Sequence, residues 1–287
     1  MPFINRRNFS EEKQIFWFAE GNITTKNVAV TNEFLSPDAE GLKLVNAGMF
    51  VADVAGDIRF LPRLTLTTAT GTGSKSVVGT PVVPFVAGDV LYVVEPQATV
   101  TIGGTVAEGD VVTITINGIP VTATAATTTL ADLVALAAAN INSNTQVKDL
   151  VKAIVSGGVI YLYAIDGVST YSIAVAETSA AVTIAVGGSA TQFAYGAAIG
   201  TVASVSVATN TITLEANASA VVPIGAHLGV RVNSVLGLDN HQREFNYETT
   251  QNFGLFTESN GVKENLLPYV DGDLKRRFSK LTFAAKV

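Results

Sequence analysis

The sequence contains no cysteine, only two histidines and unusually few charged residues. Without cysteine the chain can form neither a disulfide nor a cysteine-ligated zinc site, and it has no thiol nucleophile. Charged residues make up 15% of the sequence, against the roughly 25% that is typical of soluble domains. Such a composition favours a protein whose surface is largely covered by neighbouring molecules, or one that tolerates a neutral, Thr-rich exterior. We therefore expect an assembly component rather than an enzyme.

The chain also lacks the features that mark membrane and nucleic-acid partners. No apolar run approaches the roughly 20 residues of a membrane-spanning helix, and the first residues, MPFINRRNFSEEKQ, contain no apolar signal-peptide core. The net charge of −6 argues against nucleic acid, because binding to phosphates needs clustered Lys and Arg. We expect no membrane partner and no nucleic-acid partner.

No residue pattern points to a catalytic, metal or cofactor site. The stretch GTGSKS at 71–76 fails the phosphate-loop pattern, because serine rather than glycine precedes its Lys-Ser pair. A loop between strands is the better interpretation. His227 lies within a strand pattern and is expected to be structural. His241 lies near Asp239 and Glu244, but no further ligand or nucleophile follows at a fixed spacing, so we expect it only to form hydrogen bonds.

Short strands separated by turns dominate the segments 35–97 and 195–238. One turn-strand layout recurs, in which a glycine supplies a positive φ and the next polar residue, Asp89 or Asp110, accepts a hydrogen bond from its own backbone. Repeated short strands of this kind are typical of small all-β domains. The two segments therefore predict one discontinuous β-barrel or sandwich.

The segment between them, 98–194, predicts an inserted α+β module with the order β-β-α-β-β. Two alternating runs flank Asn117-Gly118, a strong hairpin signal because both central residues of a type I′ turn need φ > 0. A second hairpin is expected around Gly157-Gly158. Between the hairpins, Thr129 and Asp132 predict a capping-box-like helix start. The expected apolar face of the helix comprises Leu130, Leu133, Val134, Leu136 and Ile141.

The two ends of the chain differ from its middle. About ten charged side chains lie between Pro96 and Val235, whereas both ends combine charge with aromatic residues. Residues 1–34 and 239–287 are therefore predicted to be extended N- and C-terminal arms that pack against a partner. The basic run at 274–280 is interleaved with apolar residues, which favours a protein contact. The candidate partner-binding residues are Phe16, Trp17, Phe18, Arg276, Arg277 and Phe278.

Two parts of the sequence resemble structural proteins of tailed bacteriophages. The stretch GDVVTITINGIPVTATAATTTLADLVALAAANINSN, followed by VKAIVSGGVIYLYAIDG, resembles a module that recurs in such proteins. The flanking stretches GLKLVNAGMFVADVAGDIRFLPRL and LLPYVDGDLKRRFSKLTFAAKV resemble head decoration (cement) proteins, although the long insertion departs from the small members of that group. The resemblance implies a virion protein, made in the host cytoplasm, that sits on the capsid surface. Its implied partners are the major capsid protein and neighbouring copies of itself.

A second interpretation places the chain in a tail, baseplate or fibre, with the inserted module binding a host glycan. Tyr161, Tyr163 and Tyr171, together with Asp166, are the side chains that such binding would use, although alternate members of this set can belong to the core. A depolymerase is the third interpretation. The first two both require shape and contact surface rather than an active site.

Overall fold

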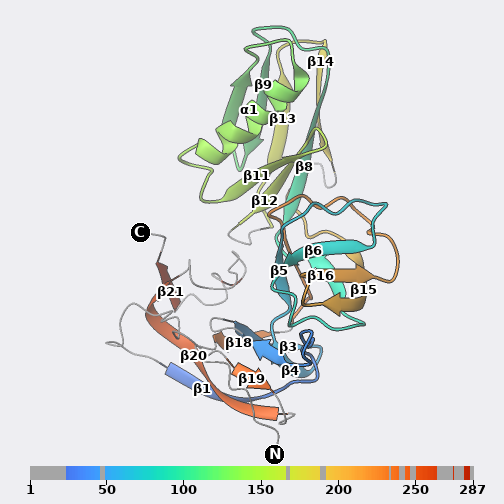
Figure 1. Ribbon diagram of the computed structural model, residues 1–287. Coiled ribbons are helices and arrows are strands. Elements are labelled where there is room, and N and C mark those ends of the chain that lie inside the picture. The colour runs from blue at the N-terminus through green and yellow to red at the C-terminus, as the bar shows by residue number, and fades with distance from the viewer. Residues whose placement is uncertain are drawn as a thin grey trace, which may run out of the picture.

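The computed structural model describes residues 24–45, 49–165, 169–187, 192–232, 234–238, 243–245, 250–263, 274 and 281–284. Over these residues the protein is mainly β, as predicted, with one α-helix. Three parts follow one another in space: a sheet that contains β1 and β20, a closed β-barrel, and the inserted module at the far end (Figure 1). No helix in the described ranges is long and apolar enough to cross a membrane.

We call the first part the terminal sheet, because it joins strands from near both ends of the sequence. Its order is β1-β20-β18-β3-β4, and β21 pairs with β20. The strands are β1 (Thr24–Thr31), β3 (Phe50–Val54), β4 (Asp57–Phe60), β18 (Ser234–Leu238), β20 (Thr250–Lys263) and β21 (Leu281–Ala284). A separate two-stranded sheet contains β2 (Lys43–Val45) and β19 (Arg243–Phe245).

The terminal sheet joins strands from the two predicted arms. β1, from the predicted N-terminal arm, pairs antiparallel with β20, from the predicted C-terminal arm, over the whole of Thr24–Thr31. β21 pairs with β20 in the parallel direction. β1, β20 and β21 are therefore neighbours in one sheet, whereas β19, also from the predicted C-terminal arm, pairs with β2 in a separate sheet. Strand periodicity alone cannot reveal these pairings, because it shows which residues share a face but not which strand lies alongside.

The barrel consists of six strands whose hydrogen bonding closes on itself in the order β15-β16-β6-β5-β17-β7. It closes because β7 pairs with both β15 and β17. Its strands are β5 (Arg63–Leu66), β6 (Ser76–Thr80), β7 (Val90–Val93), β15 (Ala198–Ser206), β16 (Thr211–Leu214) and β17 (His227–Gly229). The barrel is smaller than the predicted domain, since β2, β3, β4 and β18 fall within 35–97 and 195–238 but belong to other sheets.

The predicted turn-strand layout is present in the barrel and in the module. Gly88 and Gly109 have φ values of 91° and 92°. The carboxylate of Asp89 accepts a hydrogen bond from the Val86 N–H at 3.0 Å, and that of Asp110 accepts one from the Ala107 N–H at 2.8 Å. Both turns are therefore closed by the aspartate side chain, as the sequence predicts.

The inserted module has two sheets that share one core. Seven strands accompany the helix: four follow the predicted β-β-α-β-β order as β9, β10, β11 and β12, and β8, β13 and β14 are additional. They pair as β10-β9-β13 and β11-β12-β8-β14. Asn117 and Gly118, which join β9 to β10, have positive φ values of 50° and 80°, as predicted for this hairpin. The strands are β8 (Gln97–Gly104), β9 (Val111–Ile116), β10 (Ile119–Thr124), β11 (Val151–Ser156), β12 (Val159–Ala164), β13 (Ile173–Glu177) and β14 (Val182–Gly187).

The helix α1 (Leu130–Ser143) packs against β10 and β11 and departs from prediction in two respects. Leu136 is 36% exposed, and the buried residues are Leu133, Val134, Ala137, Ala138 and Ile141. The two alanines allow close approach to the strands, and this orientation turns Leu136 toward solvent. Thr129 forms no side-chain cap; instead the Thr127 hydroxyl donates to Asp132 and accepts the Thr129 N–H.

Candidate functional site

The residues predicted to bind a partner, Phe16, Trp17, Phe18, Arg276, Arg277 and Phe278, lie outside the described part of the chain. The strands that follow them in sequence are described. Thr24, the first residue of β1, pairs with Glu258, and Leu281, the first residue of β21, pairs with Ser259. The strands that follow the two predicted groups of partner-binding residues therefore begin beside consecutive residues of β20, Glu258 and Ser259.

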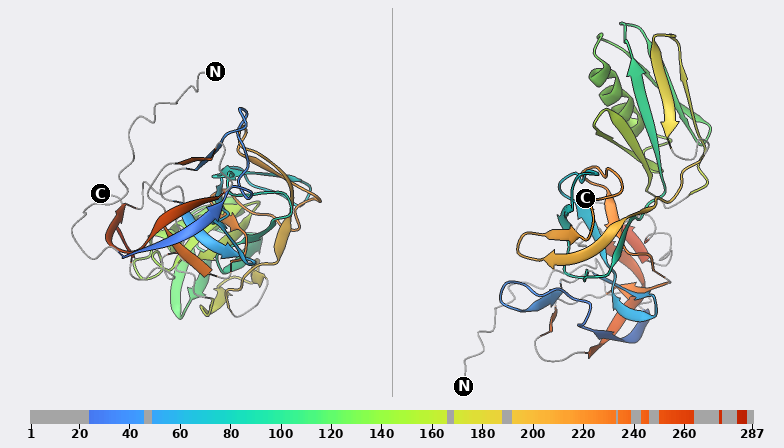
Figure 2. Two further views of the ribbon diagram at one scale, coloured as in Figure 1. Left: turned by 90° about the horizontal axis from the view of Figure 1, so that it is seen from below. Right: turned by 90° about the vertical axis from the view of Figure 1, so that its right-hand side faces the viewer.

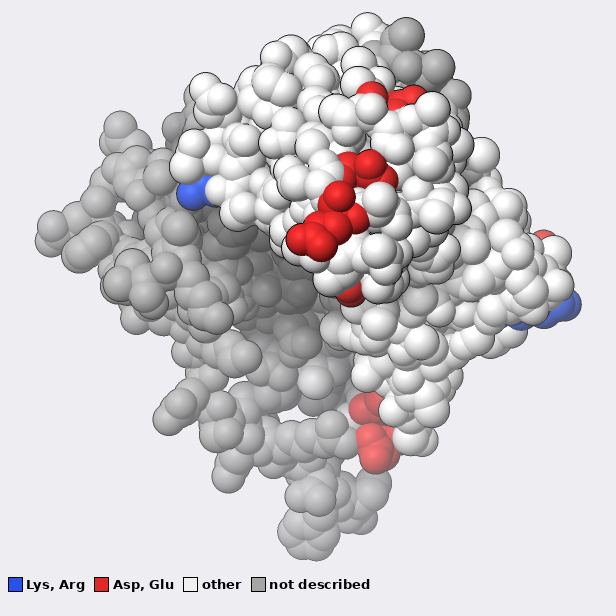
Figure 3. All heavy atoms as spheres, turned by 90° about the horizontal axis from the view of Figure 1, so that it is seen from above, with Lys and Arg blue, Asp and Glu red and all other residues white. Residues whose placement is uncertain are grey.

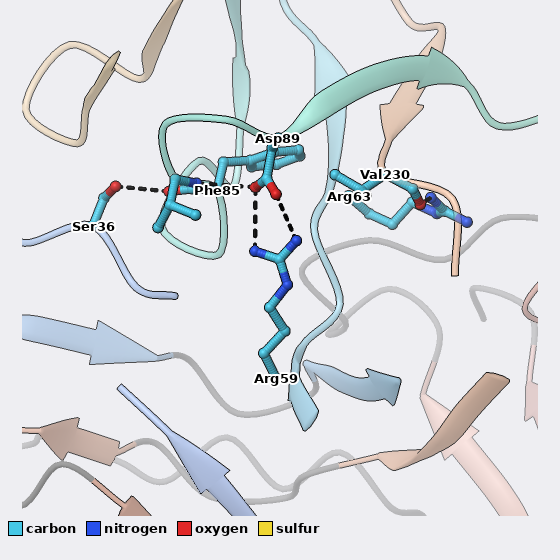
Figure 4. Close-up of polar contacts among 7 residues, drawn as sticks. Ser36, Arg59, Arg63, Phe85, Asp89 and Val230 are labelled. Atoms are coloured by element: carbon cyan, nitrogen blue, oxygen red, sulfur yellow. Dashed lines mark hydrogen bonds and ion pairs between the residues drawn. The ribbon is translucent and has the colours of Figure 1, made fainter. Parts of the chain in front are cut away.

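The terminal sheet is joined to the barrel by a buried ion pair. Arg59 of β4 donates from Nη2 to Asp89 Oδ1 at 2.5 Å and from Nη1 to Asp89 Oδ2 at 3.3 Å (Figure 4). Arg59 is 3% exposed and Asp89 is 8% exposed. A buried charge that loses its partner is strongly destabilising, so this pair strongly disfavours separation of the two parts.

Further contacts surround the ion pair. The hydroxyl of Ser36 donates to the Phe85 carbonyl at 2.7 Å (Figure 4). The Ser36 N–H donates to the Val83 carbonyl at 2.8 Å. The guanidinium of Arg59 also lies over the Phe34 ring, 4.7 Å from its centroid. The two Ser36 hydrogen bonds tie the segment after β1 to the loop before β7, and the Phe34 ring contacts the same arginine of β4 that forms the ion pair.

The module is joined to the barrel through the two faces of β12. Ile160, Leu162 and Ala164 point into the core of the module. The alternate residues, Tyr161 and Tyr163, pack instead against the barrel core, where Ile154 of β11 joins them. Because successive residues of a strand point to opposite faces, one strand belongs to two cores. Tyr163 is 1% exposed, so of the tyrosines named for the glycan-binding alternative it is one that belongs to the core.

The same joint contains a buried polar group. Glu95 is 3% exposed, and its Oε1 lies 2.9 Å from Nδ1 of His227. The Tyr163 hydroxyl is buried without a hydrogen-bond partner among the described residues. Burial raises the pKa of Tyr163 far above its ordinary value, and the Glu95 carboxylate and Tyr161 raise it further. Burial likewise raises the pKa of Tyr161.

The other residues singled out in the sequence form no catalytic or metal site within the described part of the chain. Tyr171 packs edge-on against Phe193, with ring centroids 6.3 Å apart, and Asp166 and His241 lie outside the described ranges. Lys75, in the 71–76 loop between β5 and β6, donates to the Glu215 carbonyl. Within the described ranges, no group of three or more His, Asp or Glu side chains is placed to hold a metal ion.

The outer surface of the module has few charges. Viewed from the module end, most of the described surface is uncharged, with acidic side chains in a few patches and basic ones only near the rim (Figure 3). A surface of this kind offers contact area and backbone edges rather than charged groups for chemistry. The charged residues described in the module are Glu108, Asp110, Asp132, Lys148, Asp149, Lys152 and Glu177.

No protein-family model matches the chain, and no curated protein matches it. Among solved structures, a chain from Mycobacterium phage Patience is similar. The sequence identity is 12%, the TM-score is 0.25, and the match covers 71% of this chain and 96% of that chain. A similarity at this level carries no argument about function, which therefore rests on the sequence and the geometry described above.

Proposed function

We propose that the protein is a non-enzymatic structural protein of a bacteriophage particle, and specifically a head decoration protein. In this proposal it binds the shell of major capsid protein through its terminal end and stabilises the head. The observation that carries the proposal is the separation of the two ends of the molecule. The terminal sheet, with β1, β20 and β21, lies at one end and the module at the other, with the barrel between (Figure 1 and Figure 2).

The two joints support this division of roles. A protein that attaches by one end and projects the other needs connections that resist bending. The Arg59–Asp89 ion pair and the packing of Tyr163 on the barrel core both bury side chains that would be costly to expose or leave unpaired. The module is therefore held by its joint as well as by its two chain connections.

The low charge of the module supports a role in contact rather than chemistry. Uncharged strands such as β10 and β14 leave sheet edges that can meet neighbouring copies, because unpaired edge groups are natural pairing sites. In a lattice with many copies close together, weak lateral contacts of this kind add to the attachment at the terminal end. Neighbouring copies of the chain are thus the second proposed partner.

Particles that lack the protein provide the test. Purified chain is added to such particles, which are then separated into heads and tails and assayed for bound protein. We expect the protein to sediment with heads and to saturate at a fixed ratio to the major capsid protein. Binding to tails, together with recognition of a host glycan on an array, would contradict the proposal and support the tail or fibre alternative.

A further inference from the structure

A cavity of about 390 Å³ lies where the barrel connects to the module and to the terminal sheet. Val94 follows β7 on the way into the module, Tyr195 lies on the return from it, and Val232 lies between β17 and β18. The volume is within the range of small-molecule sites. The lining residues are Arg63, Tyr92, Val93, Val94, Tyr195, Val230, Arg231 and Val232.

The position of the first arginine depends on a glycine. Arg63 is 4% exposed, and its Nη1 donates to the Val230 carbonyl at 2.6 Å (Figure 4). A Cβ at Gly229 would lie only 2.3 Å from Arg63 Nη1 and 2.6 Å from the Pro62 carbonyl oxygen. Only glycine at this position of β17 leaves room for the guanidinium to lie beside the cavity. The charge of Arg63 is therefore placed there by the fold.

The second arginine of the cavity lining, Arg231, is exposed to solvent. The guanidinium carbon of Arg231 lies 4.1 Å from the centroid of the Tyr92 ring, and Tyr92 is fixed by pairing with both Ala198 and Gly229. Stacking occupies the face of a guanidinium and leaves its N–H edge able to bind an oxyanion in two-pronged fashion. Arg231 forms no ion pair with any residue that the structure describes.

The rest of the lining is aromatic and aliphatic. Tyr195 is 46% exposed, and four valines complete the wall. No aspartate or glutamate is among the described lining residues, although the chain as a whole carries a net charge of −6. The described lining thus combines two arginine side chains with apolar walls. This combination suits a ligand that has one anionic group and a ring of monosaccharide size.

We propose that this cavity binds a sugar acid or a sugar phosphate. The carboxylate or phosphate contacts the Arg231 edge beside the charge of Arg63, and the ring lies against Tyr92, Tyr195 and the valines. The described lining includes no residue of β1, β20 or β21, and the proposal does not depend on where the protein sits in a particle. Because the ligand is small and Arg231 is solvent-exposed, we expect dissociation constants on the order of 1 mM.

Titration of the full-length protein followed by amide NMR tests the proposal. The probes are glucuronate, glucose 6-phosphate, glucose and inorganic phosphate. We expect saturable shifts around Gly229–Val232 with glucuronate, glucose 6-phosphate or both, and at least tenfold weaker binding of glucose and of phosphate. Whichever of the two anionic sugars binds more tightly identifies the source of the oxyanion.

Two variants of equal charge locate the site. Arg231→Gln removes the stacked cation and should weaken binding about tenfold, whereas Lys75→Gln removes an exposed cation that does not line the cavity and should leave affinity unchanged. Thermal unfolding of both variants checks that the fold is intact. Absence of saturable binding by both anionic sugars, or unchanged affinity in Arg231→Gln, overturns the site. Equal affinity for phosphate and glucose 6-phosphate overturns the ring-bearing ligand class.

Discussion

Gln97 and Ala194 exchange backbone hydrogen bonds at the point where the chain enters and leaves the inserted module. The Gln97 N–H donates to the Ala194 carbonyl at 2.8 Å, and the Ala194 N–H donates to the Gln97 carbonyl at 3.0 Å. One hydrophobic cluster fills the module, and its buried members all lie between Ala98 and Phe193. The chain therefore enters and leaves the module at one hydrogen-bonded residue pair, and the module's own residues form its hydrophobic core.

We predict that residues 97–194 fold cooperatively as a separate protein, because the core is internal and the ends already lie together. The excised module exposes Tyr161 and Tyr163, so a version with threonine at both positions should remain soluble at higher concentration. Thermal unfolding and amide dispersion in NMR are the measurements. A gradual melt with narrow dispersion in both versions would show that the module needs the barrel to fold.

Arg59→Met should destabilise the whole protein by about 3–5 kcal/mol, because it leaves the buried Asp89 carboxylate without its cation. Urea unfolding of the full chain measures the change. Lys75→Met removes an exposed cation instead and should cost no more than about 0.5 kcal/mol. A loss below about 1 kcal/mol for Arg59→Met would mean that Asp89 is solvated in solution and that the joint is looser than described.

Tyr163→Phe should reduce the loss of stability at alkaline pH. The folded-state pKa of Tyr163 lies above that of the unfolded chain, which is about 10. Above that pH the unfolded chain releases the phenolic proton while the folded protein retains it, so the free energy of unfolding falls as pH rises. Phenylalanine has no such proton. The free energy of unfolding of Tyr163→Phe, relative to that of the natural protein, should therefore increase from about pH 10 upward.

At neutral pH the same substitution should be neutral or stabilising by about 1 kcal/mol, because it removes a buried hydroxyl that has no hydrogen-bond partner in the described part of the chain. Denaturant unfolding at a series of pH values measures both effects, with Tyr195→Phe as the matched control, since Tyr195 is 46% exposed. Parallel curves for the natural protein and Tyr163→Phe across the alkaline range would contradict the burial of this side chain.

Asn142→Ala should destabilise the module by about 1–3 kcal/mol. The Asn142 side chain accepts the Ala153 N–H at 2.8 Å and donates to the Ala153 carbonyl at 2.9 Å, so it ties the end of α1 to β11. Hydrogen exchange of the Ala153 amide should quicken in the variant. Asn144→Ala, which removes a local turn contact to Gln146, serves as the comparison and should cost less. An equal loss of stability in the two variants would show that the hydrogen bonds from Asn142 to β11 contribute no more than the local turn contact of Asn144.

Local features of the fold could be read from the sequence because they depend on neighbouring residues. The Asn117-Gly118 turn needs two positive φ values, and the Asp89 and Asp110 turns need a carboxylate three residues after the N–H that it accepts. Each requirement is met within a few residues. The helix was likewise predictable, but its buried face was not, because that face depends on the strands against which α1 packs.

Pairings between distant segments could not be predicted. Strand periodicity assigns Tyr161 and Tyr163 to one face of β12, yet it does not say that the barrel covers that face. The Arg59–Asp89 pair joins residues 30 positions apart, and nothing around either residue marks the other as its partner. The cavity near Arg63 and Arg231 could not be predicted from the sequence for the same reason. The sequence signals it only through Gly229, because a glycine within a strand often marks the close approach of another group.

Occupancy of variants on particles that lack the protein tests terminal attachment most directly. Purified natural protein, Trp17→Ala and a deletion of residues 1–20 are added to such particles, and bound protein is measured after sedimentation, with a surface variant of the module, Leu136→Thr, as the control. Aromatic anchors dominate many interfaces, and truncating one often costs about 2 kcal/mol or more. We expect Trp17→Ala and the deletion to lose occupancy while Leu136→Thr binds normally. Full occupancy by the deletion variant would contradict attachment through the N-terminal segment.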